Sequence, residues 1–252
     1  MFSKNFDSNN YEYNPNNKVG IYLIHGFSST TYELKVLANF LKEKNYHVVL
    51  NNLPGHGTTA EDCNQSIYTD WLDYSKIEFA KLAAKSDQTF IIGISMGAVI
   101  GLYLSTLFPI NGLIIGGTVL KFKLWWHTNV LNTLLCRFLK TRKKELILPK
   151  NKRGSVMFYG YSVYPLIALN EFRKMNNMMI KKLDKVRVPI LIIRSTNDQV
   201  STKENIELLN SKIISTDKKI FIVNQALHSV FDTNPDLEKI LTEVHLMIKK
   251  NL

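Results

Sequence analysis

A serine between two glycines is the first place where this sequence could do chemistry. Ser95 lies within residues 93–97, which read Gly-Ile-Ser-Met-Gly. A short apolar run of strand character, Thr89–Ile92, precedes this G-x-S-x-G pattern, and the residues from Ala98 onward have helical spacing. On a sharp turn from strand to helix, a strained backbone holds the serine hydroxyl clear of the sheet, and the glycines avoid collisions with neighbouring elements. The pattern predicts that Ser95 is a nucleophile.

A serine nucleophile needs a base to accept its proton and an acid to orient that base. For turns of this type, the order along the chain is serine, acid, histidine. Asp198 follows the apolar run Pro189–Arg194, and His228 follows the run Lys219–Val223. Because loops at the carboxyl ends of parallel strands meet at one edge of a sheet, both side chains are expected beside Ser95. The sequence therefore predicts Asp198 as the acid and His228 as the base.

Other side chains compete for these roles. Asp232 is an alternative acid, although it lies only four residues beyond His228. His25 and His56 occupy loops at the same predicted edge of the sheet, but they precede Ser95 in the chain. We therefore expect these two histidines to have structural roles.

An acyl-transfer site also needs backbone N–H groups that stabilise an oxyanion. Met96 begins the predicted helix directly after the serine, so its amide is expected to point to the space above Ser95. A second amide is expected from the loop after an early strand, which contains Gly26, Phe27 and Ser28. We predict the Phe27 amide as this donor, with Gly26 and Ser28 as alternatives. We also expect Gly26 and Phe27 to contact the substrate.

Strand-like and helix-like segments alternate along most of the chain. Expected strands are Tyr11–Tyr13, Val19–His25, Val48–Leu53, Thr89–Ile92, Leu113–Gly116, Pro189–Arg194 and Lys219–Val223. Expected helices are Tyr32–Lys44, Trp71–Lys85, Met96–Leu107, Asn205–Leu209 with short extensions, and Asp236–Lys249. This alternation predicts an α/β fold with a mostly parallel central sheet and helices on both faces.

The alternation fails once, between residues 119 and 187. This stretch has helical periodicity without a strand partner, so we predict a helical cap at 119–187, inserted into a core formed by 1–118 and 188–252. The cap holds 16 of the 32 Lys and Arg residues and only three Asp and Glu residues, whereas the core holds 16 basic and 18 acidic residues. The formal net charge of +11 therefore comes from the cap, which argues against a general nucleic-acid-binding face.

The cap interleaves cations with large aromatic side chains, as in residues 121–127, which read Lys-Phe-Lys-Leu-Trp-Trp-His. Basic amphipathic segments that contain Trp bind anionic membrane surfaces, so peripheral contact with such a surface is one expectation. Two alternatives stay open. The lysines could simply be solvated around a cap that packs over the site, or they could recognise an anionic acyl donor.

The chain of 252 residues, 45% of them hydrophobic, is long enough for one domain of ordinary size. Cys63 and Cys136 fit no disulfide framework, and the first residues do not resemble a signal peptide, so a cytoplasmic location is expected.

Glycines and Pro109 interrupt the uncharged stretch between Asp87 and Lys121, so buried strands explain it better than a membrane span. The sequence contains no metal-ligand cluster or phosphate-binding glycine loop, so we expect no metal.

Several short motifs occur in a fixed order along the chain. They are His25-Gly26-Phe27, Pro54-Gly55-His56-Gly57, Asp70-Trp71, Gly93-Ile94-Ser95-Met96-Gly97, Asn197-Asp198-Gln199-Val200 and His228. Together they resemble the α/β-hydrolase family, in particular its bacterial carboxylesterase and monoacylglycerol lipase branch, from about Tyr11 to the C-terminus. The resemblance implies Ser95 as nucleophile, His228 as base and Asp198 as orienting acid. It also implies an oxyanion hole formed by the amides of Phe27 and Met96, a helical cap over the acyl pocket, and no cofactor.

Two features depart from the pattern of that family. Leu227 precedes His228 where the family usually has glycine, and the cap is unusually basic. Neither feature removes a catalytic group. The sequence therefore predicts a serine hydrolase that cleaves small carboxylic esters through an acyl-enzyme. An acyl thioesterase or acyltransferase with the same triad is the alternative, and a non-catalytic ligand-binding protein on this fold is a further one.

Overall fold

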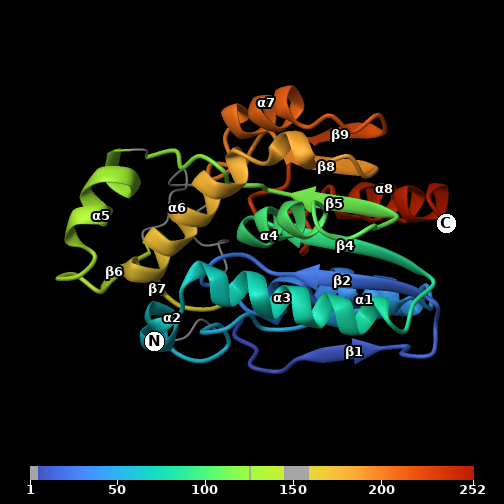
Figure 1. The fold of residues 1–252 in the computed structure, drawn as a ribbon, viewed down its shortest axis with the longest axis horizontal. Coiled ribbons are helices and arrows are strands. Elements are labelled where there is room, and N and C mark those ends of the chain that lie inside the picture. Colours follow the sequence, from blue (N-terminus) through green and yellow to red (C-terminus); the bar gives the residue numbers. More distant parts are fainter. Residues whose placement is uncertain (1–4, 125, 145–158) are drawn as a thin grey trace.

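A seven-stranded sheet forms the centre of the molecule (Figure 1). The computed structural model describes residues 5–124, 126–144 and 159–252. The strands of this sheet are β1 (Tyr11–Tyr13), β2 (Val19–Ile24), β3 (His47–Leu50), β4 (Gln88–Ile94), β5 (Gly112–Gly116), β8 (Ile190–Ser195) and β9 (Lys218–Val223). Their order is β1-β3-β2-β4-β5-β8-β9, and each pairing is parallel except that of β1 with β3. The predicted α/β fold with a mostly parallel sheet is confirmed.

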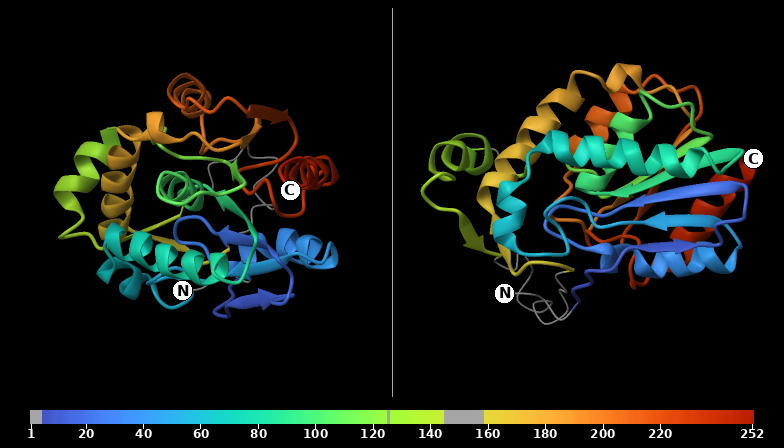
Figure 2. Two further views of the ribbon diagram at one scale, coloured as in Figure 1. Left: turned by 45° about the vertical axis from the view of Figure 1, so that its right-hand side comes forward. Right: turned by 60° about the horizontal axis from the view of Figure 1, so that its bottom comes forward.

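Helices cover both faces of this sheet (Figure 2). They are α1 (Lys35–Glu43), α2 (Ala60–Gln65), α3 (Tyr68–Ala83), α4 (Met96–Leu104), α7 (Lys203–Lys212) and α8 (Leu237–Lys250), with 3-10 turns at Thr31–Leu34 and Leu183–Lys185. One apolar cluster joins α1 and α8 to the sheet, and a second joins α3, α4 and α7 to it. In β4, Phe90 and Ile92 belong to the first cluster and Ile91 to the second. Successive residues of a strand point to opposite faces of the sheet. Each central strand therefore contributes apolar side chains to both clusters, which explains why these strands are almost uncharged.

The direction in which strands are added reverses at β2. The chain passes from β2 outward to β3, and then places β4 on the other side of β2. Ile24 at the end of β2 pairs in register with Gly93 near the end of β4. The loops after β2 and β4 therefore start side by side and run in different directions. Open α/β sheets bind their ligands in the crevice that forms at such a point. The loop that begins at His25 and the turn at Ser95 both start here.

The segment between β5 and β8 adds a small layer of its own. It contains a π-helical turn at His127–Leu131, α5 (Asn132–Leu135), α6 (Leu166–Ile180), and a two-stranded antiparallel sheet of β6 (Thr141–Lys143) and β7 (Val163–Pro165). The small sheet differs from the predicted helical cap, because three-residue strands are too short for hydrophobic periodicity to reveal. Trp125 and residues 145–158 of the predicted cap lie outside the described residues.

Within residues 5–124, 126–144 and 159–252, no helix is long and apolar enough to cross a membrane. The same residues contain no group of three side chains arranged to hold a metal ion. Cys63 and Cys136 are free and buried. Burial raises the pKa of the Cys63 thiol, so this thiol is a poor nucleophile.

Candidate active site

Ser95 occupies a sharp turn between β4 and α4. Its backbone has φ 55° and ψ −113°, and a left-handed φ of this kind is uncommon for a residue with a side chain. A Cβ added at Gly93 would lie 2.3 Å from the carbonyl oxygen of Gly97. A Cβ added at Gly97 would lie 2.0 Å from the carbonyl oxygen of Ile24. Both positions therefore need glycine for the turn to present Ser95 at the carboxyl end of β4.

Replacement of Gly97 by alanine is expected to lower the free energy of unfolding by about 3 kcal/mol or more, because the new methyl group meets backbone that cannot move aside. Gly101→Ala is the matched control in the same helix, where an added Cβ lies 3.1 Å from the side chain of Leu113. There the gain in helix propensity offsets the tighter packing, and we expect a change within about 1 kcal/mol. Urea unfolding measures both variants, and equal losses would contradict this account of the turn.

Asp198 and His228 are in direct contact. Nδ1 of His228 lies 2.8 Å from Oδ2 of Asp198. Oδ1 of Asp198 accepts the amides of Val200 at 2.7 Å and Ser201 at 3.0 Å. The Asp198 side chain is 1% exposed, whereas that of His228 is 22% exposed. The carboxylate is thus fixed through both oxygens, while the imidazole stays accessible to a substrate.

The two groups shift each other's pKa in opposite directions. Burial alone would raise the pKa of Asp198, but the charge and hydrogen bond of His228, with two backbone amides, hold it below its ordinary value. Burial alone would lower the pKa of His228, but the charge and hydrogen bond of Asp198, with the charge of Glu33, raise it above its ordinary value. An ionised Asp198 therefore favours the imidazolium that forms when His228 accepts a proton.

The end of β5 lies between Ser95 and His228. The carbonyl oxygen of Gly116 accepts the Ser95 amide at 3.0 Å. Gly117 has φ +53°, and a Cβ added there would lie 3.2 Å from Nδ1 of His228. The structure thus brings Asp198 and His228 into contact, and it places Ser95 against Gly116 and His228 against Gly117, the next residue.

Three amides in the loop after β2 are candidates for binding an oxyanion, and their hydrogen bonds distinguish them. The Gly26 amide donates to Oε2 of Glu33 at 2.8 Å. The Ser28 amide donates to Nε2 of His56 at 3.1 Å. Within the part of the chain that the structure describes, the Phe27 amide donates to no other group. Phe27 is therefore the member of this loop whose amide is available to an oxyanion.

Met96 is the first residue of α4, directly after Ser95. Amides in the first turn of a helix lack intrahelical acceptors, and the partial positive charge of the helix N-terminus favours an anion there. A Cβ added at Gly26 would lie 3.2 Å from Cβ of Ser95, so the loop after β2 passes beside the serine. The loop that carries Phe27 and the helix that begins at Met96 therefore both border Ser95.

Glu33 belongs to this site, although the sequence analysis did not single it out. It is 4% exposed, and its Oε1 accepts the hydroxyl of Ser229 at 3.0 Å while its Oε2 accepts the Gly26 amide. The carboxylate thus ties the loop that carries Phe27 to the loop that carries His228. The available signal was an acidic residue at the start of a helix-like segment, and such residues usually cap helices in solvent.

The competing side chains have other partners. Nε2 of His25 accepts a backbone amide from the loop after β3 at 3.1 Å, and Nε2 of His56 accepts the Ser28 amide. Burial lowers the pKa of both rings, so they act as neutral groups that order loops. Asp232, the alternative acid, accepts the hydroxyl of Tyr159 at 2.6 Å. These contacts give the three residues structural roles.

Aromatic rings connect the oxyanion loop to α6. The ring of Phe27 stacks on that of Phe172, with centroids 5.6 Å apart, and meets Trp71 edge-on at 6.4 Å. Phe172 also contacts Phe122 edge-on at 5.3 Å. These rings form an apolar cluster beside Phe27, in which Trp71 and Phe172 are buried.

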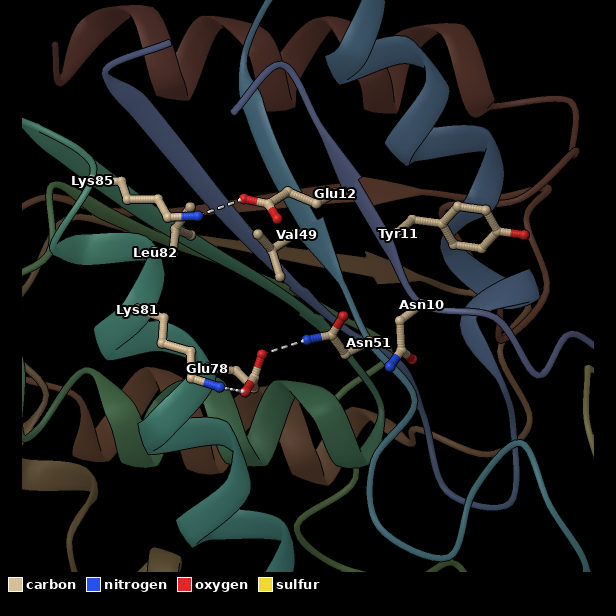
Figure 3. A pocket seen from close by; sticks show the side chains of 9 residues that line it. All are labelled: Asn10, Tyr11, Glu12, Val49, Asn51, Glu78, Lys81, Leu82 and Lys85. Carbon is tan, nitrogen blue, oxygen red and sulfur yellow. Dashed lines mark hydrogen bonds and ion pairs between the residues drawn. The ribbon is translucent and has the colours of Figure 1, made fainter. Parts of the chain in front are cut away.

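A separate groove lies beside β1 and α3, and Figure 3 shows the residues that line it. Glu78 accepts hydrogen bonds from Asn51 and Lys81, and Lys85 pairs with Glu12. The charged groups thus pair with one another. Because its lining is largely polar and includes none of the candidate site residues, this groove is not the acyl pocket.

Known proteins share the sequence family of this chain. A family model described as serine aminopeptidase, S33 matches residues 15–160, which is more than half of the chain. A thermostable monoacylglycerol lipase of Bacillus sp. (strain H-257) is 28% identical over 217 residues, which cover 86% of this chain and 85% of the lipase. A carboxylesterase of Bacillus subtilis (strain 168) is 20% identical over 220 residues, covering 86% of this chain and 87% of the esterase.

Solved structures share the fold. A structure from work on LipS and LipT, two metagenome-derived lipolytic enzymes, superposes with a TM-score of 0.85 at 23% identity, covering 96% of this chain and 98% of that one. A monoacylglycerol lipase from Paleococcus ferrophilus superposes with a TM-score of 0.78 at 15% identity, with the same coverage of 96% and 98%. From the family match and from this shared architecture, the chain belongs to the serine aminopeptidase S33 family of α/β-hydrolases.

Proposed function

We propose that this chain is a serine hydrolase that cleaves carboxylic esters through an acyl-enzyme on Ser95. The observation that carries the proposal is the hydrogen bond between His228 and the buried Asp198 at the edge of the sheet where Ser95 turns out of β4. The relatives named as monoacylglycerol lipase and carboxylesterase are enzymes of this class, which supports ester hydrolysis.

The reaction follows from the positions of these groups. Nε2 of His228 takes the proton of the Ser95 hydroxyl as its oxygen attacks the ester carbonyl. The amides of Phe27 and Met96 donate to the oxyanion of the tetrahedral intermediate. His228 then gives its proton to the leaving alcohol, and the acyl group stays on Ser95. A water molecule activated by His228 releases the acid and restores the serine.

The aromatic cluster beside Phe27 supports a proposal for the substrate class. Phe27, Phe172 and Phe122 form a continuous set of aromatic contacts from the oxyanion loop to α6, which suits an apolar acyl chain. With the monoacylglycerol lipase relative, this supports an acyl ester of glycerol as the substrate. We infer that residues 119–187 form the cap and that residues 1–118 with 188–252 form the core. A cytoplasmic location stays a prediction, supported by the two free cysteines.

A panel of monoacylglycerols with short to long acyl chains tests the proposal. We expect hydrolysis, and mass spectrometry of protein quenched during turnover should find the acyl mass on the peptide that contains Ser95. Acyl thioesters of matched chain length distinguish the alternative function. Turnover of thioesters without turnover of esters would overturn the assignment, as would an acyl group on another residue.

The pH dependence of kcat/KM is expected to show the effect of the Glu33 charge on the pKa of His228. Only neutral His228 can accept a proton, so kcat/KM should rise with pH through the pKa of His228, which lies above the ordinary histidine value of about 6.5. Glu33→Gln removes a negative charge that favours the protonated ring, so the rise should move to lower pH. The carboxylates that raise this pKa are Asp198 and Glu33.

Ser229→Ala is the control for this effect. It removes the hydrogen bond to Glu33 but leaves the carboxylate charge in place. We therefore expect its kcat/KM profile to keep the midpoint of the unmodified enzyme. Equal midpoints in the Glu33→Gln variant and the unmodified enzyme would show that Glu33 has a structural role alone.

A further inference from the structure

The segment that contains α5, beyond α6, exposes several large apolar side chains. This surface, which we call the outer cap face, comprises Leu124, Trp126, Leu131, Leu134, Leu135, Phe138 and Leu139, each more than a third exposed. Phe138 is the extreme case at 88% exposure. Figure 1 shows α5 as an outer layer that α6 separates from the central sheet. Contiguous exposed apolar surface is uncommon on proteins that act alone in water and marks an interaction site.

The same stretch buries a face of small side chains. Thr128, Asn132 and Cys136 recur at intervals of four residues and are 8%, 8% and 4% exposed. Nδ2 of Asn132 donates to the carbonyl oxygen of Leu166, the first residue of α6. Residues four apart lie on one face of a helix, so this face packs toward α6, and Leu131, Leu134 and Leu135 lie on the other sides of the helix. The larger apolar side chains of this stretch are therefore exposed to solvent and do not pack on α6.

The segment that carries the outer cap face has charged residues of one sign only. No acidic residue occurs in the sequence between Asp87 and Glu145. Arg137, Lys140 and Lys143 are exposed close to Phe138 in the sequence. A second copy of this chain would bring the same positive charge to the contact, which argues against self-association through this face. Apolar side chains flanked by cations instead match an anionic lipid surface, which offers a hydrocarbon region beneath negative head groups.

We propose that the outer cap face docks on anionic membrane surfaces. Trp126, Leu134 and Phe138 enter the interface between head groups and acyl chains, while Arg137 and Lys140 lie at the level of the head groups. Docking in this orientation places the cap between the membrane and the core. The binding does not require catalysis, so a Ser95→Ala protein docks as well as the active enzyme.

Vesicle sedimentation tests this proposal with the full chain. We expect binding to vesicles of phosphatidylcholine with phosphatidylglycerol and much weaker binding to phosphatidylcholine alone. Arg137→Gln with Lys140→Gln should weaken the partition coefficient on anionic vesicles about tenfold or more, because each cation near such a surface contributes roughly fivefold. The matched control replaces Lys212 and Lys249, which are exposed on α7 and α8, by Gln. It should change binding less than about twofold.

A second pair of variants tests the apolar contribution. Leu134→Ser with Phe138→Ser should weaken binding about tenfold or more. Ile77→Ser with Leu246→Ser removes side chains that are 56% and 53% exposed on α3 and α8, and it should leave binding unchanged. Circular dichroism and turnover of a short-chain ester in solution confirm that each variant is folded.

Three outcomes would overturn membrane docking. They are an absence of binding to anionic vesicles, equal binding to neutral and anionic vesicles, and equal losses in the cap variants and their controls. Binding to a DNA duplex without binding to vesicles would assign the cations to nucleic acid instead. Each outcome is measured as binding and does not depend on catalysis. The Ser95→Ala protein can be used in the same assays, so a failure of the proposed ester hydrolysis would be recognised separately from a failure of membrane docking.

Discussion

Ser95→Ala is expected to lower kcat for ester hydrolysis by a factor on the order of 10⁴ or more. The alanine side chain has no oxygen that can attack the carbonyl, while the oxyanion amides of Phe27 and Met96 stay in place. Alanine keeps the Cβ that serine already has at φ 55°, so the backbone strain is the same in both proteins. The variant should therefore fold normally and lose labelling by a fluorophosphonate probe.

A matched serine at the C-terminal end of α4 separates loss of the nucleophile from loss of stability. Ser105 is 6% exposed, and its hydroxyl donates to the carbonyl oxygen of Leu102 at 2.8 Å. Ser105→Ala should keep kcat within about twofold, because it removes only one hydrogen bond worth about 1 kcal/mol of stability. Labelling that persists in Ser95→Ala, or equal loss of activity in both variants, would refute the nucleophile assignment.

Asp198→Asn is expected to lower kcat by a factor on the order of 10⁴ through the tautomer of His228. Oδ1 at this position accepts the amides of Val200 and Ser201, so the asparagine oxygen must occupy the same place. Its NH₂ group then faces Nδ1 of His228, where the carboxylate Oδ2 lies at 2.8 Å. An NH₂ group donates, so Nδ1 becomes the acceptor and the proton moves to Nε2. A protonated Nε2 cannot take the proton of the Ser95 hydroxyl.

Asp232→Asn is the control for this prediction, because Asp232 is the alternative acid. Its carboxylate accepts the hydroxyl of Tyr159, and an asparagine oxygen can accept the same hydrogen bond. We expect kcat to fall less than about tenfold in this variant. Steady-state kinetics on one ester at the pH optimum compare the two proteins. A larger loss in Asp232→Asn than in Asp198→Asn would reverse the assignment of the acid.

The sequence was informative wherever a role depends on local backbone geometry. The turn at Ser95 requires glycine two residues before and after it, since any Cβ would meet backbone, and this requirement is visible as a pattern. The alternation of strands and helices places the ends of parallel strands at one edge. Asp198 and His228 could therefore be predicted from their positions after two strands, without knowledge of any distance.

The sequence was less informative in the segment between β5 and β8. The run that forms β6 is basic and only three residues long, so it carries no periodicity that distinguishes a strand from the end of a helix. Its pairing with β7 joins residues such as Arg142 and Tyr164, which are far apart in the chain. Pairing of this kind depends on how the cap packs as a whole.

By itself, the sequence determined the fold class and the three side chains of the candidate triad, because strand order and a glycine-dependent turn leave a local record. The tertiary structure alone decided which distant groups meet. Glu33 and Ser229 are 196 positions apart and yet form a hydrogen bond. The Phe27 amide could be distinguished from those of Gly26 and Ser28 only because the structure shows hydrogen bonds from these two neighbours. Only the packing of the cap segment on α6 reveals that Asn132 is buried while Leu134 and Phe138 are exposed. Such contacts arise from the three-dimensional path of the chain, and no local pattern records them.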